Sequence, residues 1–348
     1  MKIAFVNDTF IEGRGADTAI YELARRLGKK HKVYVIAGKS RGFKEENFKI
    51  IEIKTGKLYT GSLRDYFYFS KIKQFRKEIL KLNAKYKFDV FNVHHSALNP
   101  AFKGLNIIVT WNGSPPTNNI IRKILNKIVL ITLNRNKKTI AISNFLKNEL
   151  SKFINKEKIS MIYDGVSNEF KFSRKDKGYM FFVGRHEPHK SIDELIKLSK
   201  NTNFPLIIAG SGPLSEKLKD YSKKIHANKV KFVGKVSRKK LISLYQECSF
   251  FVSASKWEGF GLIFLEAAAC GKPSIAYNRC SMPEVIKNNK TGFLVNNYNE
   301  FVQKARLLIE NKNLRKKMGK EALKFSKNFG WDKIANKYEN LFKSLKNE

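Results

Sequence analysis

The sequence of 348 residues contains three cysteines, eight prolines and no long apolar run. Cys248, Cys270 and Cys280 form no C-x-x-C pair, which argues against a disulfide framework or a zinc site. His186 and His189 have a proline between them and no further ligand pattern, which favours a loop over a metal site. No segment approaches the roughly 20 apolar residues that a membrane-spanning helix requires. The first residues predict a strand rather than a signal peptide, so we expect a cytoplasmic protein. The cysteine and histidine patterns give no reason to expect a metal ion.

Acidic residues are scarce as well: 30 Asp and Glu stand against 68 Lys and Arg, giving a formal net charge of +38. The stretch between Asp89 and Glu149 contains no acid at all. Such an excess indicates an anionic partner, either a membrane surface or nucleic acid. A basic nucleic-acid-binding protein stays an alternative, although no helix-turn-helix, RNA-binding aromatic signature or zinc finger is present and we expect no nucleic acid as partner. A lysine-rich solvated surface explains the same composition.

Short apolar runs alternate with helical periodicity along the chain, which is typical of βαβ units and parallel sheets. The strands expected are 2–7, 32–37, 88–93, 107–110 and 139–143, and after a polar linker 179–184, 206–210, 230–233, 249–254 and 273–277. The helices expected between them include 18–27, 71–82, 143–153, 191–200 and 214–226, with Ser143 as an N-cap. At this length two domains are favoured. We expect two doubly wound α/β domains, 1–168 and 169–329, and an amphipathic helix within 330–348 that returns to the first domain.

Two carboxylates, Glu258 and Glu266, stand eight positions apart around a Gly-Phe-Gly turn that opens an apolar helix. Glycines before a helix N-terminus let backbone N–H groups approach a phosphate, and the helix dipole favours its negative charge. The carboxylates would repel that phosphate, so they suit hydroxyl groups instead. A nucleotide sugar has both kinds of group. A surface turn followed by a half-buried glutamate explains the same residues.

Two cations, Arg185 and Lys190, follow the first expected strand of the second domain, where ligands bind in open α/β sheets. Together they would neutralise a diphosphate, although cations are common throughout this chain. Gly210 and Gly212 follow the next strand, but the third glycine and the acidic residue of a dinucleotide motif are missing. This departure disfavours a nicotinamide cofactor, and the need for a tight turn explains the two glycines by itself.

In the first domain, a glycine-containing loop with Gly13 and Gly15 joins the first strand to the first helix, and its backbone could approach a ligand. His94 ends another strand at the same edge of the sheet. It could donate a hydrogen bond to a sugar hydroxyl or be an ordinary loop histidine.

Taken together, the ordered segments resemble the successive motifs of retaining glycosyltransferases of family four, which have the GT-B fold. The segments are 13–27, 89–94, 109–113, 141–150, 159–166, 183–190, 209–213, 258–266, 271–273 and 283–295. The resemblance covers essentially the whole chain and implies two Rossmann-like domains that face a central cleft. It also implies that the second domain holds a nucleotide-sugar donor and that the first domain holds the acceptor.

The resemblance assigns roles to single residues. Glu258 corresponds to the residue that holds donor-sugar hydroxyls, Glu266 to the ribose ligand, and His94 to the histidine near the sugar's hydroxymethyl group. Arg185 and Lys190 correspond to the pair that stabilises the diphosphate, and Phe260, Gly261 and Leu262 to the positions whose backbone amides meet phosphate and sugar. Such enzymes need no metal or other cofactor, and the leaving phosphate accepts the acceptor's proton. The chain departs from the family pattern at Asn92, Asn112, Asp164 and the loop 279–284.

The expected function is transfer of a hexose from a UDP- or GDP-sugar to a hydroxyl of a glycan or a lipid-linked acceptor, in cell-envelope, glycolipid or glycan biosynthesis. A nucleotide-sugar epimerase of the same fold is an alternative. The aromatic residues 66–69, the lysines after them and the apolar, basic stretch 120–129 suit an anionic bilayer, so a peripheral position at the inner face of the membrane is expected. A core-packed helix with a solvated face is the other interpretation of the stretch 120–129.

Overall fold

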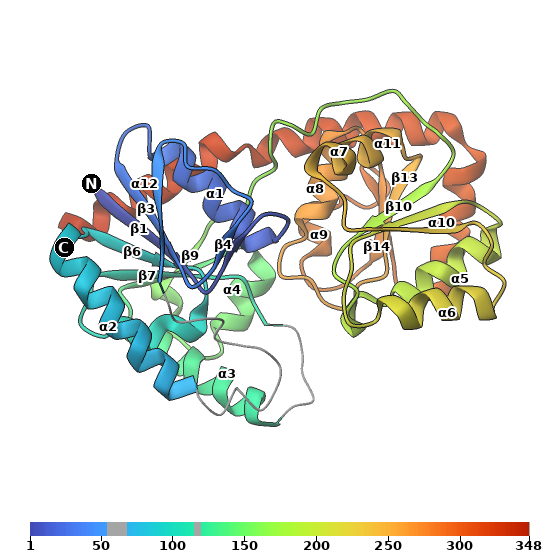
Figure 1. Ribbon diagram of the computed structural model, residues 1–348. Coiled ribbons are helices and arrows are strands. Elements are labelled where there is room, and N and C mark those ends of the chain that lie inside the picture. The colour runs from blue at the N-terminus through green and yellow to red at the C-terminus, as the bar shows by residue number, and fades with distance from the viewer. Residues whose placement is uncertain (54–67, 115–119, 348) are drawn as a thin grey trace. The chain divides into compact units, whose positions relative to one another are not determined.

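The computed structural model describes residues 1–53, 68–114 and 120–347 (Figure 1). They form two compact units: unit 1 combines Met1–Asp164 with Trp331–Glu348, and unit 2 is Gly165–Gly330. Each unit has its own parallel sheet and hydrophobic core. The expectation of an α/β protein with two parallel-sheet domains is confirmed. None of the helices in the described ranges is both long and apolar enough to cross a membrane.

Unit 1 contains a seven-stranded parallel sheet of order β5-β3-β1-β6-β7-β8-β9. Its strands are β1 (Lys2–Asn7), β3 (Lys32–Ala37), β5 (Phe48–Glu52), β6 (Val90–Val93), β7 (Ile107–Trp111), β8 (Lys138–Ala141) and β9 (Ile159–Met161). Two short strands, β2 (Phe10–Ile11) and β4 (Ser40–Arg41), pair separately. The order of the main sheet reverses between β1 and β6, which is the switch point of a doubly wound sheet. Residues 88, 89, 142 and 143 were expected in strands but lie outside them.

The helices of unit 1 are α1 (Gly15–Leu27), α2 (Tyr68–Tyr86), α3 (Ile120–Leu133), α4 (Asn144–Leu150) and α12 (Trp331–Asn347). The Ser143 hydroxyl accepts a hydrogen bond from the Leu146 N–H at 3.1 Å, so the expected N-cap of α4 is confirmed. Figure 1 shows α1 and α12 on one face of the sheet and α2 on the other.

The helix α12 supplies part of the core of unit 1. Its apolar side chains recur at helical spacing, and Trp331, Tyr338 and Phe342 are fully or almost fully buried against β1, β3 and α1. Arg26 on α1 donates to Asp332 at 2.6 Å, which ties the start of α12 to its neighbour. The core of unit 1 is therefore built from segments that are far apart in the sequence.

Unit 2 contains a six-stranded parallel sheet of order β12-β11-β10-β13-β14-β15, which reverses between β10 and β13. Its strands are β10 (Met180–Val183), β11 (Leu206–Ala209), β12 (Val230–Gly234), β13 (Phe250–Ser253), β14 (Ser274–Tyr277) and β15 (Gly292–Val295). Its helices are α5 (Ile192–Thr202), α6 (Ser215–Lys224), α7 (Arg238–Glu247), α8 (Leu262–Ala269), α9 (Met282–Val285), α10 (Tyr298–Glu310) and α11 (Lys312–Ser326).

Alternate residues of the central strands of unit 2 lie on opposite faces of the sheet. Phe182 and Phe250 join the core cluster that includes α5 and α10. Phe181 and Phe251 instead contact Tyr245 on α7, with ring centroids 4.9 and 5.5 Å apart. Both faces are thus covered, which explains why these strands are continuous apolar runs in the sequence.

We expect Phe342→Ala to destabilise unit 1 by about 3–5 kcal/mol, because it leaves a cavity in a fully buried cluster. Hydrogen–deuterium exchange read by mass spectrometry should show faster exchange in α1 and β1 and unchanged exchange in β10 and β13. The exposed Lys337→Ala, on the same helix, is the matched control and should change neither. Equal exchange in Phe342→Ala and wild type would show that α12 does not stabilise unit 1.

Candidate active site

An ion pair lies at the switch point of the sheet in unit 2. Lys190 belongs to the loop that follows β10, and Glu258 belongs to the loop that follows the neighbouring strand β13. The Lys190 Nζ is 2.6 Å from the Glu258 Oε1, and the two side chains are only 14% and 11% exposed. A second bond, from the Lys256 N–H to the His189 carbonyl at 2.7 Å, joins the same loops. The sequence assigned Lys190 and Glu258 to different parts of one ligand, and the structure brings them into contact.

The pair keeps hydrogen-bonding capacity for a ligand. An ammonium group has three donors and a carboxylate accepts about four hydrogen bonds, so one mutual contact satisfies neither group. Removing one partner of a buried pair leaves an uncompensated charge, at a cost of about 3–5 kcal/mol. A ligand that carries both hydroxyl and phosphate groups would bond to both partners and leave the pair intact.

The Gly-Phe-Gly turn next to Glu258 is fixed by backbone and side-chain contacts. Gly261 has φ +98°, and a Cβ there would lie 2.8 Å from the Phe264 ring, so only glycine fits. The Ser281 hydroxyl lies 2.9 Å from the Glu258 carbonyl and 3.0 Å from the Phe260 carbonyl. Helix α8 starts at Leu262, directly after the turn. Sequence reasoning found the turn but missed Ser281, which holds it.

Phe260 is buried, and its ring packs 5.9 Å from that of Phe329. The side chain thus anchors the turn in the core of unit 2, and only its backbone is a candidate for the diphosphate contact that the sequence assigned to this position. Leu262 opens α8 and is half-buried, and the sequence assigned its backbone to the same contact.

Glu266 occupies the second turn of α8 and faces α7. Its Oε2 accepts a hydrogen bond from the Tyr245 hydroxyl at 2.8 Å, and the Arg238 guanidinium lies 3.8 Å from its Oε1. Burial raises the pKa of Glu266 to about 7, an effect that the Arg238 charge and the Tyr245 hydrogen bond oppose. Sequence reasoning missed Tyr245 and Arg238, because no motif marks either residue.

Of the two cations expected to bind the diphosphate, Arg185 is more exposed than Lys190. Its side chain is 64% exposed and its Nε lies 2.9 Å from the Glu187 carboxylate. Glu187 also lies 3.6 Å from the His189 ring. Arg185 is therefore at the expected strand end, but its ion pair is with a neighbour in its own loop rather than with Glu258.

The glycines after β11 have a packing role. A Cβ at Gly210 would lie 2.0 Å from the Gly184 carbonyl oxygen, and one at Gly212 would lie 2.5 Å from the His186 carbonyl oxygen. The loops after β10 and β11 therefore meet backbone to backbone. This contact fixes the base of the loop that carries Arg185 and Lys190.

In unit 1, the loop after β1 is organised around Asp17. This buried carboxylate accepts hydrogen bonds from the Asn7 side chain at 2.6 Å and from the Ile11 N–H at 2.8 Å. Burial raises its pKa to about 6. Gly13 lies in this loop with φ +86° and no atom near its missing Cβ, and Gly15 is the first residue of α1. Asp17 is a further residue whose role the sequence did not indicate.

His94 follows β6 at the switch point of unit 1, as the sequence expected, and it is buried. Its Nε2 is 2.8 Å from the Asn92 side-chain oxygen, and Asn92 donates in turn to the Thr110 hydroxyl at 3.0 Å. Burial lowers the pKa of His94 to about 3, so the ring is neutral at pH 7. Its Nδ1 is buried and has no hydrogen-bond partner among the described residues.

Two further findings concern metals and thiols. Within 1–53, 68–114 and 120–347, no group of three or more His, Cys, Asp or Glu side chains is placed to hold a metal ion. Cys248, Cys270 and Cys280 are free thiols, and the first two are buried.

Two family models match consecutive parts of the chain. Residues 13–170 match the model described as Glycosyltransferase Family 4, and residues 167–325 match the model described as Glycosyl transferases group 1. The chain belongs to glycosyltransferase family 4. The resemblance found in the motifs is confirmed.

Curated relatives agree with this assignment. Two uncharacterised glycosyltransferases of Methanocaldococcus jannaschii are each 32% identical, over 210 and 229 residues. The matches cover 60% of this chain in both cases, and 60% and 58% of the relatives. The chain thus spans about three fifths of the length of these relatives.

Solved glycosyltransferase structures share the fold. A sucrose-phosphate synthase from Thermosynechococcus elongatus has a TM-score of 0.85 at 18% identity, covering 99% of this chain and 98% of that one. The Anabaena protein HepE, in complex with UDP and glucose, has a TM-score of 0.80 at 18% identity, covering 99% and 100%. The GT-B fold that the sequence predicted is confirmed.

We expect the stability of this family 4 member to show the titration of Glu266. Its pKa in the folded state, about 7, exceeds the ordinary value of 4.5, so the folded state binds more protons between these values. The free energy of unfolding should therefore fall as pH rises from 4.5 to 7, and Glu266→Gln should remove about 2 kcal/mol of that fall. Urea unfolding at pH 5 and pH 8 measures this change in the free energy of unfolding. Glu216→Gln, at an 80% exposed position, is the control; parallel pH profiles for wild type and Glu266→Gln would contradict the expectation.

Proposed function

We propose that the protein is a retaining, metal-independent hexosyltransferase that moves a sugar from a nucleoside diphosphate sugar to a hydroxyl of a glycan or lipid-linked acceptor. The observation that carries this proposal is the Lys190–Glu258 pair at the switch point of unit 2, next to the N-terminus of α8. A cation, a carboxylate and the N-terminus of a helix at one strand edge suit a ligand with phosphates and hydroxyls. The structural neighbour HepE was solved with UDP-glucose, which supports a UDP-sugar donor.

The donor contacts follow from this geometry. Lys190 and Arg185 would bind the diphosphate, and the first N–H groups of α8, after Gly261, would add the positive end of the helix dipole. Glu258 would accept hydrogen bonds from the sugar hydroxyls, and Glu266 would accept them from the ribose. Because Glu258 also contacts Lys190, the pair would fix the sugar relative to its leaving group. The loop glycines 210 and 212 would act by shaping this edge. Gly13 and Gly15 would let the backbone of their own loop approach a phosphate or a sugar group.

The reaction breaks the bond between the anomeric carbon and the diphosphate oxygen and forms one to the acceptor oxygen on the same face of the sugar. The acceptor's proton passes to the leaving phosphate. Lys190, Arg185 and the α8 dipole would stabilise the charge that develops on the diphosphate, which is the role of an electrostatic catalyst. His94, being neutral, would form a hydrogen bond with a hydroxyl group rather than supply a proton.

A membrane-surface acceptor is supported by α3. Ile120, Ile124, Ile128 and Ile131 recur along one side of this helix and are 70%, 55%, 44% and 55% exposed. Lys123 and Lys127 are exposed beside them. An exposed apolar stripe with flanking cations suits the surface of an anionic bilayer, to which a lipid-linked acceptor would be confined. Tyr66 and Phe67, from the aromatic segment that the sequence also indicated, lie outside the described residues.

We expect Glu258→Gln to reduce kcat by about 10²–10³-fold, because a preorganised polar contact to the reacting sugar is lost. The assay is a panel of nucleotide sugars scored for released UDP, GDP or ADP, and Lys190→Ala should also weaken UDP binding in calorimetry. Lys256→Ala, from the same loop and 59% exposed, is the matched control and should retain full activity. Circular dichroism confirms folding. Full activity of both site variants would overturn the assignment, and donor rearrangement without an acceptor, followed by NMR, would indicate an epimerase.

We expect sedimentation with phosphatidylglycerol vesicles to depend on the α3 stripe. Replacing Ile124 and Ile128 by serine should reduce the bound fraction by at least about threefold, because two exposed apolar contacts are lost. Leu307→Ser, which changes an exposed apolar residue of unit 2, is the control. Equal sedimentation of all three proteins, or binding that neutral vesicles match, would exclude α3 as the membrane contact.

A further inference from the structure

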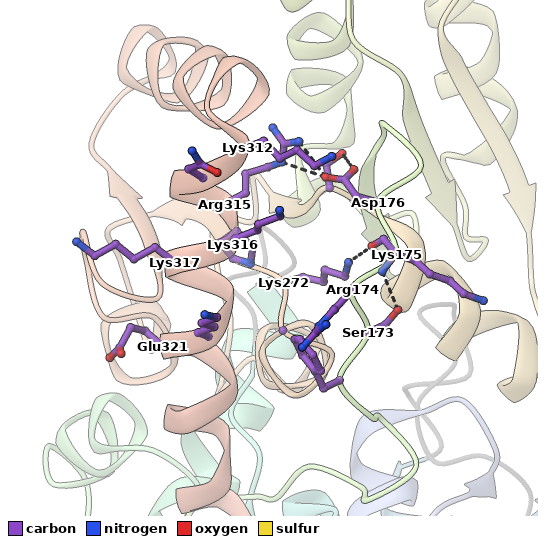
Figure 2. Close-up of a pocket in the computed structure, with 16 residues that line it drawn as sticks. Ser173, Arg174, Lys175, Asp176, Lys272, Lys312, Arg315, Lys316, Lys317 and Glu321 are labelled. Carbon is purple, nitrogen blue, oxygen red and sulfur yellow. Dashed lines mark hydrogen bonds and ion pairs between the residues drawn. The ribbon is translucent and has the colours of Figure 1, made fainter.

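Unit 2 contains a cavity of about 650 Å³ that lies at the other end of its sheet from Glu258. Four segments line it: residues 172–176 of the chain that enters unit 2, Ser249 just before β13, residues 271–273 just before β14, and residues between 312 and 321 of α11. Since Glu258 and Lys190 follow the C-terminal ends of β13 and β10, the cavity and the candidate donor site occupy opposite edges of one sheet. Figure 2 shows the cavity between α11 and the entering segment.

Two glycines bring α11 close to the backbone beside the cavity. A Cβ at Gly319 would lie 2.2 Å from the Gly271 carbonyl oxygen, so α11 touches the backbone that follows α8. A Cβ at Gly271, where φ is +74°, would lie 2.5 Å from the Phe172 ring. The backbone contact holds α11 in place, and the N-terminal half of α11 then stands beside residues 172–176 to form the wall of the cavity. Backbone packing therefore fixes the position of α11 relative to the other walls of the cavity.

The charge of the lining is strongly unbalanced. Eight basic and two acidic side chains line the cavity. Both acids already have partners: Asp176 is 2.9 Å from Arg315, and Glu321 is 3.5 Å from Lys290. Among the described residues no carboxylate lies within 4.0 Å of the charged groups that remain, which are those of Arg174, Lys175, Lys272, Lys312, Lys316, Lys317 and Lys320. Together these cations create a positive potential that attracts an anionic ligand.

Two of these groups are aimed at the cavity by the fold. Lys272 is only 5% exposed, and its ammonium group donates to the Lys175 carbonyl. Burial lowers its pKa, so the positive charge is poorly solvated there. Figure 2 shows Lys316 directed from α11 toward the side where Lys272 and Arg174 lie, whereas Lys317 and Glu321 extend from the other side of the helix. Lys312 and Asn313, at the N-terminus of α11, add the positive end of a 15-residue helix.

We propose that this cavity binds a ligand that carries two or more phosphate groups, at a site separate from the donor site. The cavity volume lies within the range of small-molecule pockets, about 300–1,000 Å³. The lining contains several ammonium groups and a guanidinium, whereas an ion with a single negative charge would need only one cationic group. The diphosphate or phosphate groups can belong to a soluble molecule or to a lipid headgroup. Their shared chemistry is recognition by Arg174, Lys272 and the lysines of α11.

Calorimetry with inorganic pyrophosphate tests the soluble case. The test variant is Lys316→Gln combined with Lys320→Gln, and the matched control is Lys223→Gln combined with Lys224→Gln, two exposed lysines of α6. Because pyrophosphate can also enter the donor site, all measurements are repeated in a Lys190→Ala background. In that background the test variant should bind pyrophosphate at least about tenfold more weakly than its parent, and the control should bind equally well.

Sedimentation with vesicles that contain cardiolipin, whose headgroup carries two phosphates, and with phosphatidylcholine vesicles as the neutral reference, tests the headgroup case with the same proteins. Loss of pyrophosphate binding alone assigns a soluble ligand, and loss of charge-dependent vesicle binding alone assigns a lipid headgroup; either result supports the site. The proposal is overturned if the test variant matches its parent in both assays, or if the α6 control loses as much as the test variant. Because the Lys190→Ala background already lacks the donor contact, failure here leaves the proposed transferase activity unaffected.

Discussion

The Lys190–Glu258 ion pair is the interaction on which the geometry of the candidate site depends. It joins the loops that leave β10 and β13, at the one place in the sheet where successive crossovers turn in opposite directions. Both side chains are mostly buried, so the pair loses hydration. Only good geometry and further hydrogen bonds offset the free energy of that loss. The contacts of Ser281 with the turn and of Lys256 with His189 hold both loops in the position that this geometry requires.

Helix α8 connects two electropositive regions of unit 2. Its N-terminus follows the Gly-Phe-Gly turn, and its C-terminus leads into Gly271 and Lys272 at the second cavity. Eight residues of helix span about 12 Å, so the two regions are separated by little more than one buried element. The dipole favours an anion only at the N-terminal end. At the C-terminal end the positive potential comes from side chains, among them Lys272, which offset the partial negative charge of the helix.

The alternation of apolar runs and helical periods was sufficient to predict the parallel sheets, because strands buried on both faces leave continuous apolar segments. It missed β5, β9 and β15, which are short or contain polar residues, and α7, α10 and α11. Glu258, Lys190 and the glycine turn could be found, since their chemistry is visible in single residues. The contact between Lys190 and Glu258 could not, because it spans 68 positions and follows from strand order. Ser281 and Tyr245 were missed for the same reason: each acts through one hydrogen bond across the fold.

The position of α12 in the core of unit 1 has a consequence for how the chain is made. Unit 2 is one continuous stretch, Gly165–Gly330, whereas unit 1 needs Trp331, Tyr338 and Phe342 to fill its core. During synthesis from the N-terminus, all of unit 2 is translated before these three side chains exist. Part of one apolar face of the unit 1 sheet therefore stays uncovered until α12 has been translated, after all of unit 2. All residues of unit 2 are thus present before the core of unit 1 can close.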